Sequence, residues 1–266
     1  MQVVLSIAGS DSSGGAGIQA DIKTAEAFGC FCATAITVVT AQNTLGVRSV
    51  MPMSAKMVRE QIDAVMEDCE VGAIKIGMLY DTEIIETVGE FLLQNSLKIP
   101  VVLDPVALSQ AGSKLLKDEA IESLKKLFPL ATLITPNLEE SRLFFGLNQV
   151  PTLEMMECEG ARYTRELGVH IVVKNIRKGN QSIDYLAQKG HASSIYRTQF
   201  IQNAQRHGTG CTFSSAIACL LAKGASVQES VQRAKNYVHE AMIHAPMIGR
   251  GSGPILHRVG SLSARE

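Results

Sequence analysis

Short runs that are apolar at nearly every position alternate along this chain with stretches of helical periodicity. Residues 2–8, 73–76 and 101–103 are examples of such runs. A strand without alternating polar positions is buried on both faces, as happens in a parallel sheet between two layers of helices. The pattern therefore predicts an α/β fold, a three-layer αβα sandwich that is doubly wound around a mostly parallel sheet.

The pattern changes in the last third of the chain. Ile171–Lys174 still has the character of a buried strand, but only a short glycine-containing loop separates Ser182–Ala187 from Ser193–Arg197. Two strands so close in sequence form an antiparallel hairpin. We therefore expect an antiparallel edge on the sheet. Two helices, Thr212–Lys223 and one that begins after Ser226, complete the chain.

Composition limits the class of protein. The chain has 266 residues, 46% apolar and 19% charged, which is enough to close one core, so we expect a single domain over residues 1–266. The net charge of −1 gives no bulk attraction to nucleic acid or to an anionic membrane. No apolar run approaches the roughly 20 residues of a membrane span. A basic start followed by a ten-residue apolar run is also absent, and together these observations predict a cytoplasmic protein. Six cysteines without a C-x-x-C pair indicate reduced thiols.

The loop from Gly9 to Gly17 is the first candidate binding segment, because ligands of doubly wound sheets bind beyond the carboxyl ends of the strands. It contains four glycines and lies between a predicted strand and a predicted helix. Ile18-Gln19 stands where a P-loop needs Lys and then Ser or Thr, and the G-x-G-x-x-G spacing is absent. Taken alone, the segment is explained equally well as a flexible turn and as an anion-binding loop.

Two polar residues near this edge have no obvious structural partner. Asp21 stands one turn into the first helix, with no basic residue three or four positions further on. It either interacts with the helix dipole or hydrogen-bonds a polar ligand. Gln42 follows the second strand with an amide that both donates and accepts, although a simple turn residue would look the same.

Acidic residues follow two other strands. Asp104 comes directly after a buried strand and before Pro105, which ends strand pairing, and a magnesium-bound water is a candidate partner for it. Asn137 and Glu140 stand three positions apart at the start of a predicted helix. This spacing fits a ligand site on one side of the helix, and it fits a capping box equally well.

The most informative segment is Arg206–Thr212, directly before an apolar helix. Gly208 and Gly210, on either side of Thr209, allow backbone amides to converge at the helix N-terminus and to stabilise charge on a transferring phosphoryl group. In the first turn of a helix the pKa of a thiol can fall below its usual value, so Cys211 is a candidate base or charge stabiliser. The alternative is an inert buried cysteine.

Together and in this order, these segments resemble the vitamin-kinase branch of the ribokinase-like superfamily. Within that branch they are most similar to the bacterial hydroxymethylpyrimidine and hydroxymethylpyrimidine phosphate kinases of thiamine biosynthesis. The resemblance spans nearly the whole chain. The matching segments are Ala8–Asp11, Gly17–Asp21, Ala41–Thr44, Lys75–Leu79, Leu103–Val106, Ile134–Asn137 and His207–Cys211.

The resemblance implies transfer of the γ-phosphoryl group of ATP, with Mg²⁺, to 4-amino-5-hydroxymethyl-2-methylpyrimidine and then to its monophosphate. It also implies a homodimer, and a cysteine where most of the superfamily has an aspartate base. By position it assigns four sets of residues. The pyrimidine would contact Gly9, Asp21, Gln42, Met78 and Val106; Mg²⁺ would be held by Asp104 and Glu140, and the nucleotide by Asn137, Lys174 and Thr209; the catalytic group would be Gly208, Thr209, Gly210 and Cys211.

Two segments depart from the family pattern. Lys174-Asn175-Ile176-Arg177 stands where the family commonly has Lys-Gly-Gly-His, so the loop on the nucleotide side should differ in shape and charge. Arg250 interrupts a skeleton of glycine and proline near the C-terminus, either as a surface charge or as an extra phosphate ligand. Two other functions fit the same scaffold. One is a pyridoxal or pyridoxine kinase, and the other is a catalytically idle sensor that keeps the pyrimidine pocket.

Overall fold

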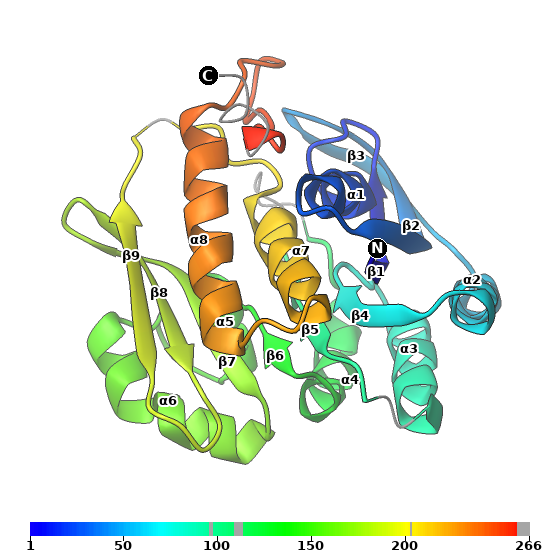
Figure 1. Ribbon diagram of the computed structural model, residues 1–266, viewed down its shortest axis with the longest axis horizontal. Coiled ribbons are helices and arrows are strands. Elements are labelled where there is room, and N and C mark those ends of the chain that lie inside the picture. Colours follow the sequence, from blue (N-terminus) through cyan, green and yellow to red (C-terminus); the bar gives the residue numbers. More distant parts are fainter. Residues whose placement is uncertain (96–97, 109–113, 203, 260–266) are drawn as a thin grey trace.

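One sheet of nine strands, in the order β3-β2-β1-β4-β5-β6-β7-β8-β9, forms the centre of the computed structural model (Figure 1). The structure describes residues 1–95, 98–108, 114–202 and 204–259. The strands are β1 (Val3–Asp11), β2 (Phe31–Asn43), β3 (Gly46–Pro52), β4 (Val71–Ile76), β5 (Val101–Leu103), β6 (Leu133–Ile134), β7 (His170–Lys178), β8 (Gln181–Ala187) and β9 (Ser194–Gln199).

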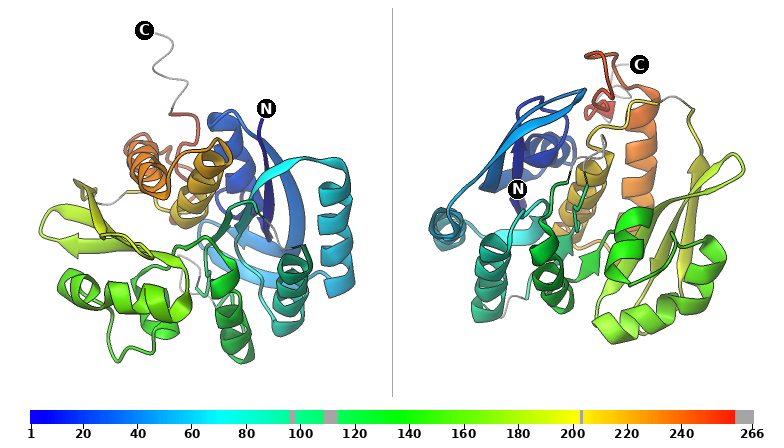
Figure 2. Two further views of the ribbon diagram at one scale, coloured as in Figure 1. Left: turned by 60° about the horizontal axis from the view of Figure 1, so that its bottom comes forward. Right: turned by 180° about the vertical axis from the view of Figure 1, so that it is seen from behind.

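Two layers of helices cover this sheet, as the sequence predicts (Figure 2). Helices α1, α7 and α8 lie on one face, and α2 to α6 lie on the other. Their bounds are α1 (Gly17–Ala27), α2 (Ala55–Asp68), α3 (Thr82–Asn95), α4 (Ile121–Lys126), α5 (Leu138–Phe144), α6 (Leu153–Leu167), α7 (Thr209–Ala222) and α8 (Val227–Ile243). None of the helices within the described residues is both long enough and apolar enough to span a membrane.

The continuous apolar runs of the strands arise from this double burial. Along β1, Val4 packs into the core beneath α7 and α8, whereas Leu5 and Ile7 pack into the core on the opposite face. Both faces of the strand therefore require apolar side chains, and no polar alternation appears in the sequence. The prediction of a three-layer α/β sandwich is confirmed.

The strand directions confirm the predicted hairpin and add a second antiparallel edge. The central strands β2, β1, β4, β5, β6 and β7 are parallel, while β8 and β9 pair antiparallel with Gln181 opposite Gln199. At the other edge, β3 pairs antiparallel with β2. The sequence does not predict β3, because Arg48 and Ser49 at its centre are exposed and the strand lacks a buried apolar run.

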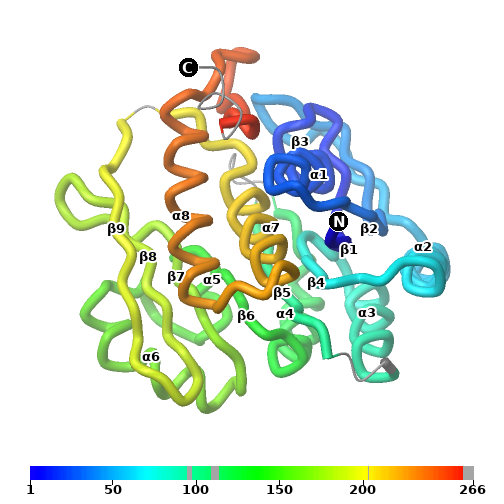
Figure 3. The backbone as a smooth tube through the Cα atoms, viewed as in Figure 1, coloured from blue at the N-terminus to red at the C-terminus, as the bar shows by residue number. Residues whose placement is uncertain are grey.

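Segments that are distant in sequence meet at the carboxyl ends of the parallel strands. The turn between β1 and α1, the segment before α7 and the chain after α8 lie side by side (Figure 3). The backbone N–H of His207 donates to the carbonyl of Gly253 at 3.1 Å, and Gly15 packs against His207 and Pro254. This contact fixes the entry of α7 over the end of the sheet.

Candidate active site

A cavity of about 120 Å³, called here the strand-end cavity, opens where the parallel strands end. Most of the site residues predicted from the sequence line it. They are Gly9, Gln42, Met78, Asp104, Val106, Asn137, Glu140, Lys174, Gly208, Gly210 and Cys211. These residues converge because parallel strands bring all their carboxyl ends to one edge of the sheet.

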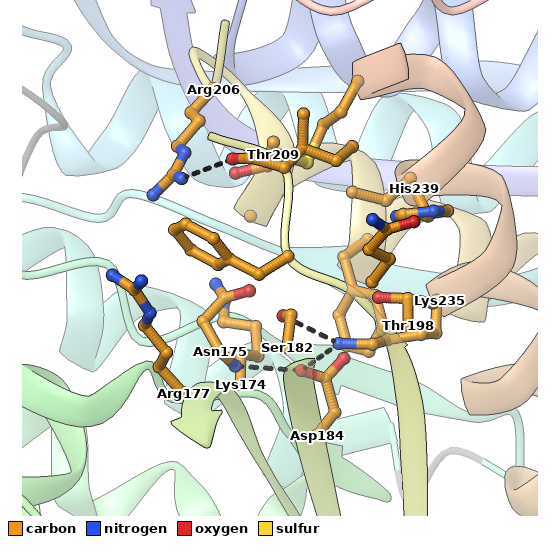
Figure 4. A pocket seen from close by; sticks show the side chains of 17 residues that line it. Lys174, Asn175, Arg177, Ser182, Asp184, Thr198, Arg206, Thr209, Lys235 and His239 are labelled. Carbon is orange, nitrogen blue, oxygen red and sulfur yellow. Dashed lines mark hydrogen bonds and ion pairs between the residues drawn. The ribbon is translucent and has the colours of Figure 1, made fainter. Parts of the chain in front are cut away.

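A second cavity of about 230 Å³, called here the hairpin cavity, lies beside the first (Figure 4). Side chains of β8, β9 and α8 form its walls, and Lys174 and Gly210 line both cavities. Thr209 lines the hairpin cavity and not the strand-end cavity. The two cavities therefore meet at the N-terminus of α7.

Gly208 shapes that N-terminus. Its φ is 84°, and a Cβ atom there would lie 1.8 Å from the carbonyl oxygen of Gly15, so a side chain does not fit. The N–H of Thr209 donates to the carbonyl of Arg206 at 3.2 Å. No acceptor among the described residues takes the N–H groups of Gly210 and Cys211. Two free amides and the positive end of the helix dipole thus face the junction of the cavities.

Asp11 ties the first loop to the entry of α7. Its Oδ2 lies 2.7 Å from Nε2 of His207 and accepts hydrogen bonds from the backbone N–H groups of Gly15 and Ala16. Burial alone would raise its pKa, but the hydrogen bonds from His207 and Ser13 and from the backbone lower the pKa to about 2. Asp11 is therefore ionised at neutral pH. The sequence does not predict this contact, since its only local signal is an acidic residue at the end of a strand.

Asp21 lines neither cavity, and its predicted contact with the pyrimidine stays a prediction. Its side chain is 1% exposed. Oδ2 accepts from Lys75 Nζ at 2.8 Å and from Ser6 Oγ at 2.6 Å, and Oδ1 accepts from Ser215 Oγ at 2.6 Å. Lys75 lies 54 positions away in β4, so the spacing of three or four residues within a helix does not predict this partner. Both oxygens of Asp21 are engaged in the buried structure.

Asp104 and Lys174 form a buried ion pair in the wall of the strand-end cavity. Oδ1 of Asp104 accepts from Lys174 Nζ at 2.7 Å and from Thr135 Oγ1 at 3.0 Å. Oδ2 has no donor among the described residues and points toward Gly210, where a Cβ atom would lie 3.3 Å from it. One carboxylate oxygen thus remains available at the junction of the cavities.

Asn137 and Glu140 form the capping box that the sequence leaves open as a structural explanation. Oε2 of Glu140 accepts from the N–H of Asn137 at 2.8 Å, and Oδ1 of Asn137 accepts from the N–H of Glu140 at 2.9 Å. Both residues also line the strand-end cavity. Burial raises the pKa of Glu140 to about 7, although Lys174 opposes this shift. The capping box therefore leaves both residues at the wall of the strand-end cavity.

The carboxylates of Asp104 and Glu140 fit a magnesium ion that arrives with phosphate. No group of three or more His, Cys, Asp or Glu side chains with the arrangement of a metal site occurs within the described residues. Mg²⁺ commonly uses one or two carboxylates, with waters and substrate phosphates completing its shell. The oxygen donors present match that mode of binding better than they match a fully protein-bound metal.

The thiol of Cys211 is neutral at physiological pH, which corrects the predicted shift. Burial raises the pKa of Cys211 to about 11, although the ammonium of Lys75 favours the thiolate. The expectation of a lowered pKa is wrong because desolvation outweighs the positive end of the helix. Cys211 therefore faces the strand-end cavity as a small, uncharged side chain.

The two departures from the family pattern have different outcomes. Asn175 adopts a left-handed conformation with φ of 64°, and its N–H donates to Oδ1 of Asp184 at 2.9 Å. Asparagine is among the residues that tolerate this conformation, so the chain can bend here without glycine. Arg250 is exposed and lines neither cavity, which agrees with a surface charge.

Comparison with known proteins gives a consistent family. A family model described as phosphomethylpyrimidine kinase matches residues 11–256. Hydroxymethylpyrimidine/phosphomethylpyrimidine kinase from Haemophilus influenzae is 39% identical over 260 residues, which is 96% of each chain. Phosphomethylpyrimidine kinase from Clostridium difficile 630 superposes with a TM-score of 0.79 at 39% identity, over 91% of this chain and 99% of that one. Pyridoxal kinase from Bacillus subtilis, solved as an ADP complex, superposes with a TM-score of 0.87 at 35% identity, over 98% and 99%.

Proposed function

This chain belongs to the phosphomethylpyrimidine kinase family, and on that premise we propose that it transfers the γ-phosphoryl group of ATP to 4-amino-5-hydroxymethyl-2-methylpyrimidine and then to the resulting monophosphate. One observation carries the proposal. The free amides of Gly210 and Cys211 lie where the strand-end cavity, which Gln42 lines, meets the hairpin cavity. Lys174 lines both cavities. An acceptor in the first cavity and a nucleotide in the second would bring the reacting groups together at these amides.

The strand-end cavity suits a small planar heterocycle with hydrogen-bonding edges. Met78 and Val106 supply apolar surface for a ring, and Gly9 lines the same cavity while its backbone packs closely against Val38 and Met78. Gln42 supplies an amide whose Oε1 is held by Thr40 Oγ1 at 3.3 Å. An amide both donates and accepts, which complements the ring nitrogen and exocyclic amine of an aminopyrimidine.

The free amides provide the electrostatic part of the reaction. Phosphoryl transfer passes through a loose transition state whose charge spreads over the equatorial oxygens, so catalysis depends on positioning and on charge stabilisation. The N–H groups of Gly210 and Cys211 are oriented for this by the turn at Gly208, before any substrate binds. Lys174 adds a fixed positive charge, held by Asp104 at 2.7 Å.

Asp104 and Glu140 would hold Mg²⁺ through their carboxylate oxygens, and Asn137 would fix Glu140 from the other end of the capping box. When bound, the ion neutralises charge on the nucleotide phosphates. Use of ATP is supported by the ADP complex of the pyridoxal kinase that this chain resembles.

Cys211 would accommodate two different acceptors. An alcohol acceptor has to lose a proton late in the transfer, and a phosphate acceptor is already ionised and has no such need. A carboxylate beside a phosphate acceptor would repel it, whereas the neutral thiol does not. The raised pKa of Cys211, about 11, therefore supports a role as an uncharged contact rather than as a thiolate base.

Pyridoxal kinase is the second candidate function, because the TM-score with the Bacillus subtilis pyridoxal kinase is 0.87. Steady-state turnover of ATP with hydroxymethylpyrimidine, its monophosphate and pyridoxal separates the two. We expect the highest kcat/KM with the two pyrimidines. A higher value with pyridoxal would overturn the assignment. Pyrimidine binding in isothermal titration without ATP consumption would indicate an idle sensor instead.

We also propose a cytoplasmic homodimer. All six cysteines are free thiols, which fits a reducing compartment. Large apolar side chains on the β2–β3 edge are exposed, with Phe31 at 57% and Met51 at 68%, and such side chains are usual at subunit contacts. Sedimentation equilibrium over a range of protein concentrations measures the mass of the assembly, and a purely monomeric mass would contradict this proposal.

A further inference from the structure

Two arginines to which the proposed reaction assigns no role lie over one aromatic ring in the hairpin cavity. The guanidinium carbon of Arg177 lies 4.2 Å from the centre of the Phe200 ring, and that of Arg206 lies 4.9 Å from it. All three residues line the cavity. Figure 4 shows both arginines at one side of it and the Lys235–Asp184 pair at the other.

These two arginines lack an acidic partner within the described residues. Four cationic side chains line the hairpin cavity, but the only carboxylate among its described lining residues is that of Asp184. Asp184 already accepts from Lys235 Nζ at 2.9 Å. The fourth cation, Lys174, is paired with Asp104 outside this cavity.

Arg177 and Arg206 instead donate to backbone carbonyls, those of Gly179 at 3.4 Å and Ile201 at 3.1 Å. Carbonyl oxygens carry no net charge, so two positive charges remain uncompensated. The Phe200 ring provides cation–π attraction to each guanidinium group but no countercharge. A ligand with anionic groups that reach both side chains would offset their mutual repulsion and accept charge-assisted hydrogen bonds from each.

The position of the pair indicates which anion. Arg206 is one residue before His207, and its carbonyl accepts the first N–H of α7 at 3.2 Å. It therefore lies directly beside the free amides proposed to receive the transferred group. Arg177 lies farther out, three residues beyond Lys174 along β7. A chain of phosphates that begins at the amides and runs outward through the cavity passes both arginines.

We propose that Arg177 and Arg206, which both lie over the Phe200 ring, form a clamp for the phosphates of the nucleotide that are not transferred. The clamp makes the affinity depend on the length of the polyphosphate chain. Arg177 belongs to the segment in which this chain departs from the Lys-Gly-Gly-His of the family it resembles. The clamp therefore depends on a residue in which this chain differs from the family pattern. The inference rests on the proposed kinase function.

Isothermal titration with adenosine, AMP, ADP and a non-hydrolysable ATP analogue tests the clamp. We expect Arg177→Gln and Arg206→Gln each to weaken binding of ADP and the analogue by about tenfold, with adenosine unchanged. Arg197→Gln is the matched control, because Arg197 is an exposed arginine of the neighbouring β9 that lines neither cavity. It should bind all four ligands as the parent chain does. Arg177→Lys should recover part of the loss, since it keeps the charge but not the planar fork.

The outcomes separate the clamp from the proposed function. Equal losses for adenosine and ADP would mean that the arginines contact the nucleoside, and unchanged ADP affinity would mean that they contact no ligand; either result overturns the clamp. Phe200→Leu, which removes the ring and keeps both charges, gives a second test, because it should reduce ADP affinity more than adenosine affinity. If the parent chain phosphorylates the pyrimidine while the arginine variants bind ADP normally, only the clamp fails. If the variants lose ADP affinity but the parent chain phosphorylates no pyrimidine, only the function fails.

Discussion

Nε2 of His207 lies 2.7 Å from Oδ2 of Asp11, although the two residues are 196 positions apart. The contact joins the end of the first strand to the residue that precedes the turn at Gly208. Because Asp11 also accepts the N–H groups of Gly15 and Ala16, one carboxylate holds the glycine loop and the entry of α7 in a fixed relation. The charge that develops in the proposed reaction would thus be stabilised by amides whose positions depend on a single buried anion.

Asp11→Asn should therefore be destabilising in a pH-dependent way. The pKa of this carboxyl is about 2 in the folded protein, compared with 3.8 for an unperturbed aspartate. The stabilisation from ionised Asp11 is fully present above about pH 4 and is lost as the pH falls through 3.8 to 2, and it amounts to about 2 kcal/mol. The difference in unfolding free energy between the parent chain and Asp11→Asn, measured by urea titration, should be the same at pH 7 and pH 5 and smaller at pH 3.

Glu154→Gln is the control for this experiment. The pKa of Glu154 is also lowered to about 2, by Lys178, but both side chains are exposed, so solvent screens the pair. We expect no measurable loss of stability from this variant. A loss equal to that of Asp11→Asn would show that burial of the carboxylate is not what makes the Asp11 contact stabilising.

Gly208→Ala should abolish activity and destabilise the chain, and Gly224→Ala should do much less. Both glycines have φ of 84°, so both substitutions carry the same strain of a left-handed backbone, about 1 kcal/mol. At Gly208 the new Cβ atom would lie 1.8 Å from the carbonyl oxygen of Gly15, whereas at Gly224 nothing lies within 4 Å. Thermal unfolding and pyrimidine turnover measure the two effects. Equal losses in the two variants would mean that strain alone, and not the close approach, constrains Gly208.

The sequence predicts the parts of the site that depend on strand order. Parallel strands end at one edge, so Gln42, Asp104 and Asn137 could be expected to converge from their positions after predicted strands, and the structure brings them to one cavity. The hairpin cavity was not predicted. Its walls come from β8, β9 and α8, which the chain pattern identifies as elements but does not place against one another.

Contacts across the sheet account for most of what the sequence could not show. Asp21 has no partner at helical spacing, and its ion pair with Lys75 forms because α1 packs against α7 and over β1, the neighbour of β4 in the sheet. The pKa of Cys211 depends likewise on how deeply the fold buries the first turn of α7, and the position of a thiol in a helix does not reveal that depth. Local rules gave the correct capping box at Asn137 and Glu140, because that motif is closed within four residues.

Glu140→Gln should raise the Mg²⁺ concentration needed for activity without destabilising the chain. Glutamine keeps a carbonyl oxygen that can accept the N–H of Asn137, so the capping box is preserved, while one of the two proposed carboxylate ligands is lost. We expect the half-saturating Mg²⁺ concentration to rise by about tenfold or more.

Asn137→Ala is the complementary variant, and loss of the cap should cost about 1 kcal/mol of unfolding free energy. Unchanged Mg²⁺ dependence in Glu140→Gln would remove Glu140 from the proposed metal site.

Substitution of Cys211 should separate the two phosphoryl transfers. Cys211→Asp places a carboxylate where the neutral thiol faces the strand-end cavity, so it should repel an acceptor that is already a phosphate and slow the second transfer far more than the first. Cys211→Ala removes a neutral thiol that lines the strand-end cavity and leaves the free amides in place. Because a neutral thiol is not a base, the variant should slow the two transfers by similar and small factors.

Rates of both transfers, measured with purified hydroxymethylpyrimidine and its monophosphate, provide the test. Cys158→Ala serves as the control because Cys158 is an exposed thiol that lines neither cavity.

The neutral state of the Cys211 thiol can be checked independently. Since the pKa of Cys211 is about 11, its alkylation by iodoacetamide in the Cys158→Ala background should remain slow at pH 7 and accelerate only as the pH approaches 11. Rapid alkylation near pH 7 would mean that the parent chain already carries a thiolate at position 211. The carboxylate of Cys211→Asp would then add no new negative charge, and charge repulsion could not explain a slower second transfer.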